Sequence, residues 1–178
     1  HIKSFHFFNE DLTIKIYSNN NVDHIFDKVN NIHKKYHKYY QSPSYINETE
    51  LLDLIEYGKG LYEKTNGLID ITAGKLITSI EENEEYDFHT SIKNLDFGKK
   101  ETLDVISFDS IIGSYATNIV KKYLEENGVD KYIINEDGNI IAGNHYNNDK
   151  YKVSITDASG NLVEIVYLKG KAMATKGN

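Results

Sequence analysis

The segment KYIINEDGNIIAG, residues 131–143, constrains the fold more than any other part of the sequence. Two apolar runs flank Asp137-Gly138, and this dipeptide favours the left-handed conformations of a two-residue hairpin turn. A second hairpin is predicted over residues 151–168, with its turn at residues 159–161. The second half of the chain is therefore expected to be rich in antiparallel strands.

Apolar side chains at helical spacing predict three main helices. Two cover residues 22–40 and 110–127. The third follows the capping box of Asn47 and Glu50 and ends at Asn66-Gly67, with Gly67 as the left-handed residue. Other predicted elements are a hairpin over residues 5–18 turning at residues 9–11, a short helix at 74–81, an exposed loop at 81–94, a strand at 101–109 and the start of a strand at residue 171. Because helices and strands mix without a regular βαβ alternation, we predict one α+β domain over residues 1–178.

Charge and composition exclude several classes of function. The net charge is −7 and the lysines form no basic stripe, which argues against nucleic-acid binding. All 20 basic residues are lysines, so a phosphate site would have to use Lys, backbone N–H groups or a metal. The chain has no cysteine, which excludes disulfides and thiolate chemistry. No apolar run approaches the roughly 20 residues of a membrane helix, so no transmembrane segment is expected.

Asp70 is the most informative single residue, because it interrupts the apolar run GLIDIT at residues 67–72. The pattern leaves two interpretations open: an exposed acid on a strand, or a polar anchor in an apolar pocket wall. His33 and His37 are one helical turn apart and could hold a metal between them. Their lysine neighbours favour a solvated helix face instead.

The segment SFDSIIGSYATN, residues 107–118, predicts a helix start with Ser110 and Gly113 in its first turn. The unpaired N–H groups and the positive end of the helix dipole at such a start can hold an anion. The alternative is that Asp109 or Ser110 serves as an ordinary N-cap.

The order of these segments resembles the FAD:protein FMN transferase (ApbE) family. Four segments follow one another in the order of the family motifs: NGLIDITAGKL, the run from SFDSIIGSYATN to GNIIAG, VSITD and KAMATKG. The resemblance implies a T-fold-like α+β fold of mixed and antiparallel sheets packed with three main helices. Carried over by position, it implies flavin contacts from Leu68, Ile69, Asp70, Ser107, Gly113 and Phe8, and a metal contact from the main chain of Ser110.

Members of this family are extracytoplasmic bacterial enzymes, often lipoproteins. They bind FAD with a divalent metal, usually Mg²⁺, and transfer FMN from FAD to a Ser or Thr hydroxyl of a partner flavoprotein. The resemblance therefore implies FAD as substrate, Mg²⁺, a flavin-acceptor protein as partner and a location outside the cytoplasm, with a possible lipid anchor before processing.

The chain departs from the family pattern at several positions. Ser107 stands in place of an acid, Gly113 in place of a lysine and Asn118 in place of a second acid. The family continues for tens of residues beyond the motif at residues 175–177 and carries its main metal carboxylate there, so we expect this chain to lack that C-terminal portion. Asp109 could substitute for the acid lost at Ser107 if the strand continues that far. Two functions remain open: an active transferase, or a catalytically inactive flavin- or protein-binding module.

Overall fold

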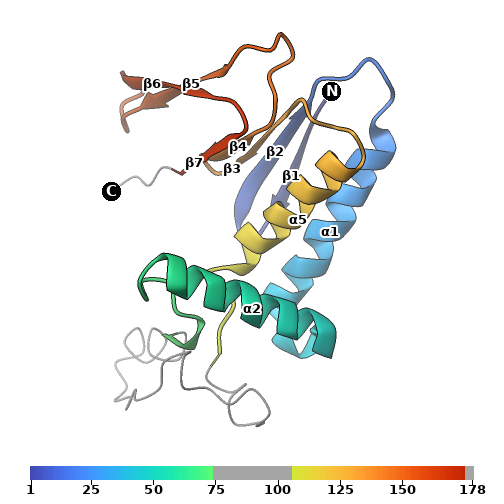
Figure 1. Cartoon of the computed structure of the whole chain (residues 1–178), viewed down its shortest axis with the longest axis vertical. Coiled ribbons are helices and arrows are strands. Elements are labelled where there is room, and N and C mark those ends of the chain that lie inside the picture. The colour runs from blue at the N-terminus through green and yellow to red at the C-terminus, as the bar shows by residue number, and fades with distance from the viewer. Residues whose placement is uncertain (74–105, 175–178) are drawn as a thin grey trace. The chain divides into compact units, whose positions relative to one another are not determined.

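A computed structural model describes residues 1–73 and 106–174 (Figure 1). The chain forms two compact units. The first unit contains His1–Lys34 and Ile119–Asn178, and the second contains Lys35–Asn118. Within the described residues, three main helices are present, as predicted: α1 (Asp23–Gln41), α2 (Glu48–Lys64) and α5 (Ile112–Glu126). Both α1 and α5 contribute residues to each unit, while α2 belongs to the second unit alone.

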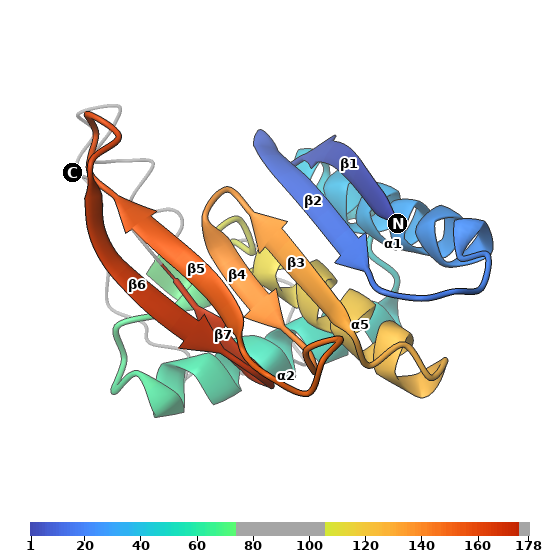
Figure 2. The ribbon, with the colours of Figure 1, turned by 90° about the horizontal axis from the view of Figure 1, so that it is seen from above.

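The first unit is built on an antiparallel sheet with strand order β1-β2-β3-β4-β7. Its strands are β1 (Ile2–Phe7), β2 (Glu10–Ile16), β3 (Tyr132–Glu136), β4 (Asn139–Ala142) and β7 (Lys171–Met173). A separate antiparallel ribbon consists of β5 (Tyr151–Thr156) and β6 (Leu162–Leu168). Figure 2 shows this ribbon beside β4 and β7. The mixture of helices with antiparallel strands confirms the predicted α+β class.

The sheet of the first unit buries apolar side chains on one face, and on its other face at β3, β4 and β7. On one face, alternate residues Leu12, Ile14 and Ile16 of β2 are fully buried. Figures 1 and 2 show the first-unit residues of α1 and α5 along one face of this sheet. The other face carries a second cluster, formed by Ala142, Tyr151 and Leu168. The ribbon packs on this second face, because β5 and β6 supply two of its three buried side chains.

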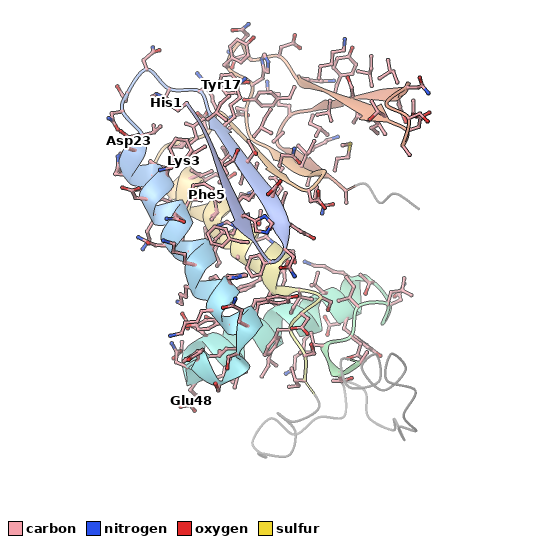
Figure 3. The ribbon with its side chains drawn as sticks, turned by 180° about the vertical axis from the view of Figure 1, so that it is seen from behind. His1, Lys3, Phe5, Tyr17, Asp23 and Glu48 are labelled. Carbon is pink, nitrogen blue, oxygen red and sulfur yellow. The ribbon has the colours of Figure 1, made fainter. Side chains whose placement is uncertain are left out.

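Lys3 connects the edge strand β1 to α1 within the first unit. Its ammonium group lies 5.8 Å from the ring centroid of Phe26 and 3.8 Å from a carboxylate oxygen of Asp27. Figure 3 shows Lys3 and Phe5 on β1 next to α1. A lysine on an edge strand also hinders pairing with another chain.

Two hairpin turns place non-glycine residues in the left-handed region. Asp137 and Gly138 have φ values of 45° and 89°, which confirms the predicted turn between β3 and β4. The first hairpin turns at Phe8 and Asn9, with φ values of 55° and 64°, so the prediction of a turn at residues 9–11 was wrong. A bulky residue such as phenylalanine rarely adopts a positive φ, and its side chain gives no signal for such a turn.

The second unit begins α2 with the predicted capping box. The Asn47 side chain accepts a hydrogen bond from the backbone N–H of Glu50 at 3.0 Å and donates one to the Glu50 carboxylate at 2.8 Å. Glu50 also forms an ion pair with Lys35 and accepts a hydrogen bond from the hydroxyl of Tyr39, both on α1. A short 3₁₀ helix, η1 (Pro43–Tyr45), lies between the two helices.

Three predicted elements fall wholly or mostly outside the described residues: the helix at 74–81, the loop at 81–94 and residues 101–105 of the strand at 101–109. The last four residues of that strand, 106–109, are described and are not in a strand. Among the helices in residues 1–73 and 106–174, none combines the length and the apolarity needed to cross a membrane.

Candidate functional site

The loop that follows α2 starts with two left-handed residues. Asn66 and Gly67 have φ values of 53° and 87°. The Gly67 N–H donates to the carbonyl of Tyr62 at 2.8 Å, and the Asn66 N–H donates to the carbonyl of Glu63 at 3.3 Å. This is the double hydrogen-bond pattern of a Schellman motif. The left-handed turn therefore begins at Asn66, one residue before the predicted stop at Gly67.

Thr65 fixes the next part of the loop. Its hydroxyl donates to the carbonyl of Leu61 at 2.7 Å and accepts from the N–H of Ile69 at 3.0 Å. The side chain of Leu68, between these anchors, is 90% exposed. An apolar side chain presented in this way is available to contact a ligand or a partner, so the flavin contact predicted for Leu68 and Ile69 stays a prediction.

Asp70 caps the short 3₁₀ helix η2 (Ile71–Ala73). One of its carboxylate oxygens accepts hydrogen bonds from the N–H of Thr72 at 2.9 Å and from the hydroxyl of Thr72 at 2.7 Å. Asp70 is half-buried and lies outside any strand. The interpretation as an exposed strand acid is therefore wrong, and the carboxylate has a defined role in shaping the loop.

Ile71 joins this loop to the segment that leads into α5. Its carbonyl accepts a hydrogen bond from the N–H of Ser107 at 2.8 Å. Its side chain is 1% exposed and packs on α2 against Gly58, where an added Cβ would lie 2.8 Å from Cγ2 of Ile71. The two segments singled out from the sequence, around residue 69 and around residue 111, are therefore neighbours in the second unit.

The start of α5 is formed by a backbone turn. The carbonyl of Phe108 accepts hydrogen bonds from the N–H groups of Ile111 at 2.9 Å and Ile112 at 2.8 Å. The first bond within the helix is donated by Tyr115 to Ile111 at 2.9 Å, so the N–H groups of residues 113 and 114 have no partner inside the helix. Two N–H groups and the positive end of the helix dipole coincide here, as the anion interpretation requires.

Ser107 and Asp109 lie in a turn and not in the predicted strand, and the flavin contact predicted for Ser107 stays a prediction. The hydroxyl of Ser107 accepts a hydrogen bond from the N–H of Asp109 at 3.3 Å, which closes a local turn in place of a strand. The condition for Asp109 to lie on the same strand face as Ser107 is therefore not met. Within the described residues, neither Asp109 nor Ser110 caps α5 through its side chain, and both are exposed.

Sequence reasoning missed a pair that connects α2 to α5. The side-chain amide of Asn118 donates to the hydroxyl of Tyr57 at 2.9 Å. The ring of Tyr57 also meets the ring of Tyr115 edge-on, with 5.0 Å between centroids. Burial raises the pKa of the Tyr115 hydroxyl, and the negative charge of Asp53 raises it further. The spacing of Tyr115 and Asn118 places both on one helix face, but no local pattern in the sequence identifies Tyr57 as their partner.

The described residues do not by themselves form a metal site. No group of three or more His, Asp or Glu side chains that could hold a metal occurs within residues 1–73 and 106–174. His33 is 0% exposed, and its Nδ1 lies 3.2 Å from the carbonyl of Val29, so the expectation of a solvated face was wrong there. Burial lowers the pKa of His33 to about 4. His37 is half-buried and stacks on the ring of Tyr40.

Phe8 belongs to the first unit, whereas the other predicted flavin residues belong to the second. It lies at the tip of the β1–β2 hairpin, half-buried, with its ring centroid 6.3 Å from that of His33. The flavin contact predicted for Phe8 stays a prediction, as does the metal contact of the Ser110 main chain.

A cavity of about 640 Å³ also occurs in the first unit, beside the stacked rings of Tyr17 and Tyr146. Figure 3 labels Tyr17 and His1, which both border it. None of the residues predicted from the sequence lines this cavity. The remaining lining residues are Ile16, Ser18, Asn19, Asn20, Asp130 and Lys131.

Solved structures of similar fold come from three bacteria. The flavin transferase ApbE from Vibrio cholerae superposes with a TM-score of 0.75 at 15% sequence identity, covering 100% of this chain and 71% of that protein. An ApbE protein from Thermotoga maritima gives a TM-score of 0.73 at 18% identity, with 99% and 70% covered. The apo form of the flavinyl transferase ApbE from Pseudomonas stutzeri gives 0.72 at 16% identity, with 100% and 69% covered.

Comparison with curated protein sequences found no match. The sequence pattern of the ApbE family, in contrast, matches residues 8–178. That match spans nearly the whole chain, including both halves of the candidate site. The protein described here is therefore a member of the ApbE family.

Proposed function

We propose that the protein is a FAD:protein FMN transferase, which moves FMN from FAD to a Ser or Thr hydroxyl of a partner flavoprotein. One observation carries the proposal: the hydrogen bond from the Ser107 N–H to the Ile71 carbonyl at 2.8 Å. It places the loop with Asp70 next to the start of α5, and the sequence pattern of the ApbE family spans both segments. The similar fold of the Vibrio cholerae flavin transferase and the Pseudomonas stutzeri flavinyl transferase supports this proposal.

The reaction is a transfer of a phosphoryl-linked group. The acceptor hydroxyl oxygen forms a bond to the phosphorus of the FMN half of FAD. The bond from that phosphorus to the bridging oxygen breaks, AMP leaves with the electron pair, and the hydroxyl proton is released to a base or to solvent. Such reactions depend mainly on positioning the reactants and on stabilising charge.

The start of α5 offers backbone donors to a phosphate group. The N–H groups of Gly113 and Ser114 lie in its first turn without intrahelical partners. Since the sequence contains no arginine, backbone donors of this kind take on more importance for an anionic substrate. Leu68 and Ile69 would contact the apolar flavin, and Asp70 would accept hydrogen bonds from it.

Mg²⁺ enters this proposal through the family resemblance alone. The described residues offer the exposed carboxylate of Asp109 and the main chain of Ser110, which are too few ligands for a protein-only site. Mg²⁺ is commonly held by one or two carboxylates together with substrate phosphates. We therefore assign no step of the reaction to a metal held by these residues.

A second function is favoured by three substitutions at the site. Ser107, Gly113 and Asn118 are uncharged where the family pattern has an acid, a lysine and an acid. Loss of charge at all three positions would weaken the stabilisation of charge on which the reaction depends. The alternative is a catalytically inactive module that binds flavin or a protein partner.

We further propose a location outside the cytoplasm, with a lipid anchor before processing.

The test is incubation of the protein with FAD, Mg²⁺ and an acceptor flavoprotein with a Ser or Thr site. The transferase predicts that the acceptor gains the mass of FMN less water and that an equal amount of AMP is released. Flavin binding without either product supports the binding module. Absence of both binding and transfer contradicts the proposed function.

A further inference from the structure

We propose that Tyr57 and Asn118 form a positioning pair, which holds the first turn of α5 in place for the phosphate groups of a flavin dinucleotide. The inference rests on the proposed function, because it assumes that the site binds FAD. It goes further by assigning a role to Tyr57 and Asn118, which act through the position of α5 rather than through contact with the flavin.

The first argument is the position of Tyr57 on α2. The next residue, Gly58, is buried and contacts Ile71, whose carbonyl accepts the hydrogen bond from Ser107. The loop at residues 65–73 is therefore held against α2 at residue 58. Tyr57 holds α5 against the same helix, through its hydrogen bond with Asn118.

The second argument is that Tyr57 contacts α5 at two points. Asn118 bonds the Tyr57 hydroxyl at 2.9 Å, and Tyr115 meets the Tyr57 ring at a centroid distance of 5.0 Å. Tyr115 and Asn118 are three residues apart, so they lie on the same face of α5. Two contacts on one face restrict both the distance of this helix from α2 and its rotation about its own axis.

The third argument is the place of these contacts along α5. Tyr115 follows directly after residues 113 and 114, whose N–H groups have no partner within the helix, and Asn118 lies one turn further on. A rotation of the helix at Asn118 would change the direction in which those N–H groups point. Hydrogen bonds weaken steeply when their angle departs from linearity, so anion binding at the helix start depends on this orientation.

The experiment compares the binding of FAD and riboflavin to the whole chain. Riboflavin carries the isoalloxazine ring without phosphate, so it reports on the loop at residues 65–73 independently of the start of α5. Tyr57→Phe keeps the ring contact with Tyr115 and removes the hydrogen bond. We expect this variant to bind FAD about fivefold more weakly, while riboflavin binding stays within about twofold of wild type.

A double-mutant cycle tests whether the two residues act together. Asn118→Ala should weaken FAD binding as much as Tyr57→Phe, and the double variant should bind no more weakly than either single variant. Asn118→Asp supplies an oxygen that can accept from the Tyr57 hydroxyl. When Tyr57 is present, the Asn118→Asp variant should therefore bind FAD more tightly than the Asn118→Ala variant. When Tyr57→Phe is added to both, their FAD affinities should be equal.

Tyr123→Phe is the matched control, because Tyr123 lies on α5 and its hydroxyl makes no hydrogen bond within the described residues; its FAD affinity should equal that of wild type. Equal weakening of FAD and riboflavin by Tyr57→Phe, or additive losses in the double variant, would overturn the positioning role. A wild-type protein that binds neither compound would instead overturn the proposed function together with this inference.

Discussion

Ile71 packs directly on Gly58, so closely that a Cβ added to residue 58 would lie 2.8 Å from its Cγ2 and 3.0 Å from its Cδ1. Distances below 3.0 Å are shorter than van der Waals contact allows, so only glycine fits at position 58 without movement of Ile71. This contact sets how closely the loop at residues 65–73 lies to α2. Because the Ile71 carbonyl also accepts the hydrogen bond from Ser107, it positions the Ser107 segment as well.

Gly58→Ala should therefore destabilise the protein, although alanine is the better helix former. The helix gains about 1 kcal/mol from the loss of glycine, but overpacking of a buried contact costs about 1–3 kcal/mol. We expect the free energy of unfolding to fall by roughly 1 kcal/mol in urea titrations.

The control for this substitution is Gly60→Ala on the same helix, where an added Cβ has no heavy atom within 4 Å. It should raise the free energy of unfolding by about 0.5–1 kcal/mol. An equal gain in stability from both substitutions would contradict the close packing of Ile71 on Gly58.

His33 should make stability depend on pH. Burial lowers its pKa from 6.5 to about 4 in the folded protein, so the unfolded chain binds the proton more readily. Stability contributed by neutral His33 is thus complete above pH 6.5 and is lost as the pH falls toward about 4, by roughly 3 kcal/mol in total. Urea titrations at several pH values in this range measure the loss.

His33→Gln should lose this pH dependence, because glutamine does not titrate. His24→Gln is the matched control: His24 is exposed on the same helix, and its substitution should leave the pH profile of wild type. A His33→Gln variant with the same decline in stability would show that other groups cause it.

Asp70 can be tested for separate roles in the loop and in flavin binding. Asp70→Ala removes the acceptor for both Thr72 hydrogen bonds and should lower the free energy of unfolding by about 1 kcal/mol as well as weaken flavin binding. Asp70→Asn keeps one oxygen for Thr72 and replaces the other with an amide donor. This variant should keep the stability of wild type and still bind FAD about tenfold more weakly.

Calorimetry gives the stability and fluorescence quenching of the flavin gives the affinity. If Asp70→Asn binds FAD as tightly as wild type, then Asp70 serves the loop alone and the flavin contact must come from its neighbours.

Asn47 should stabilise α2 through the capping box. Asn47→Ala leaves the N–H of Glu50 without its acceptor and should cost about 1 kcal/mol. Asn47→Asp keeps the acceptor but loses the amide donor and places a second carboxylate beside Glu50, so its stability should be intermediate. Thermal melting of both variants decides this, and an alanine variant as stable as wild type would contradict the cap.

Local chemistry was sufficient to predict most elements of the fold. The Asp137-Gly138 turn, the capping box at Asn47 and the three main helices each follow from a pattern within a few residues of sequence. The hairpin at Phe8 was misplaced because its left-handed phenylalanine goes against the intrinsic preference of that residue. The sequence does not record which tertiary contacts overrule such a preference.

The candidate site was predicted less completely than the fold. The alternation Ile69-Asp70-Ile71 suggested a strand, but the Asp70 carboxylate stabilises a 3₁₀ turn by a hydrogen bond two residues away. The burial of His33 and the Tyr57–Asn118 bond depend on residues distant in sequence, which periodicity cannot identify. The family resemblance, in contrast, implied flavin contacts from both Asp70 and Ser107, and their two segments are neighbours in the structure.

The exposed side chain of Leu68 sits on a loop whose path is set largely by main-chain hydrogen bonds and by Thr65. Replacing that side chain should cost little folding free energy, because few contacts are lost. Substitutions at position 68 can therefore change recognition without a loss of stability that other substitutions would have to restore. Related proteins could diverge in ligand or acceptor preference through this position.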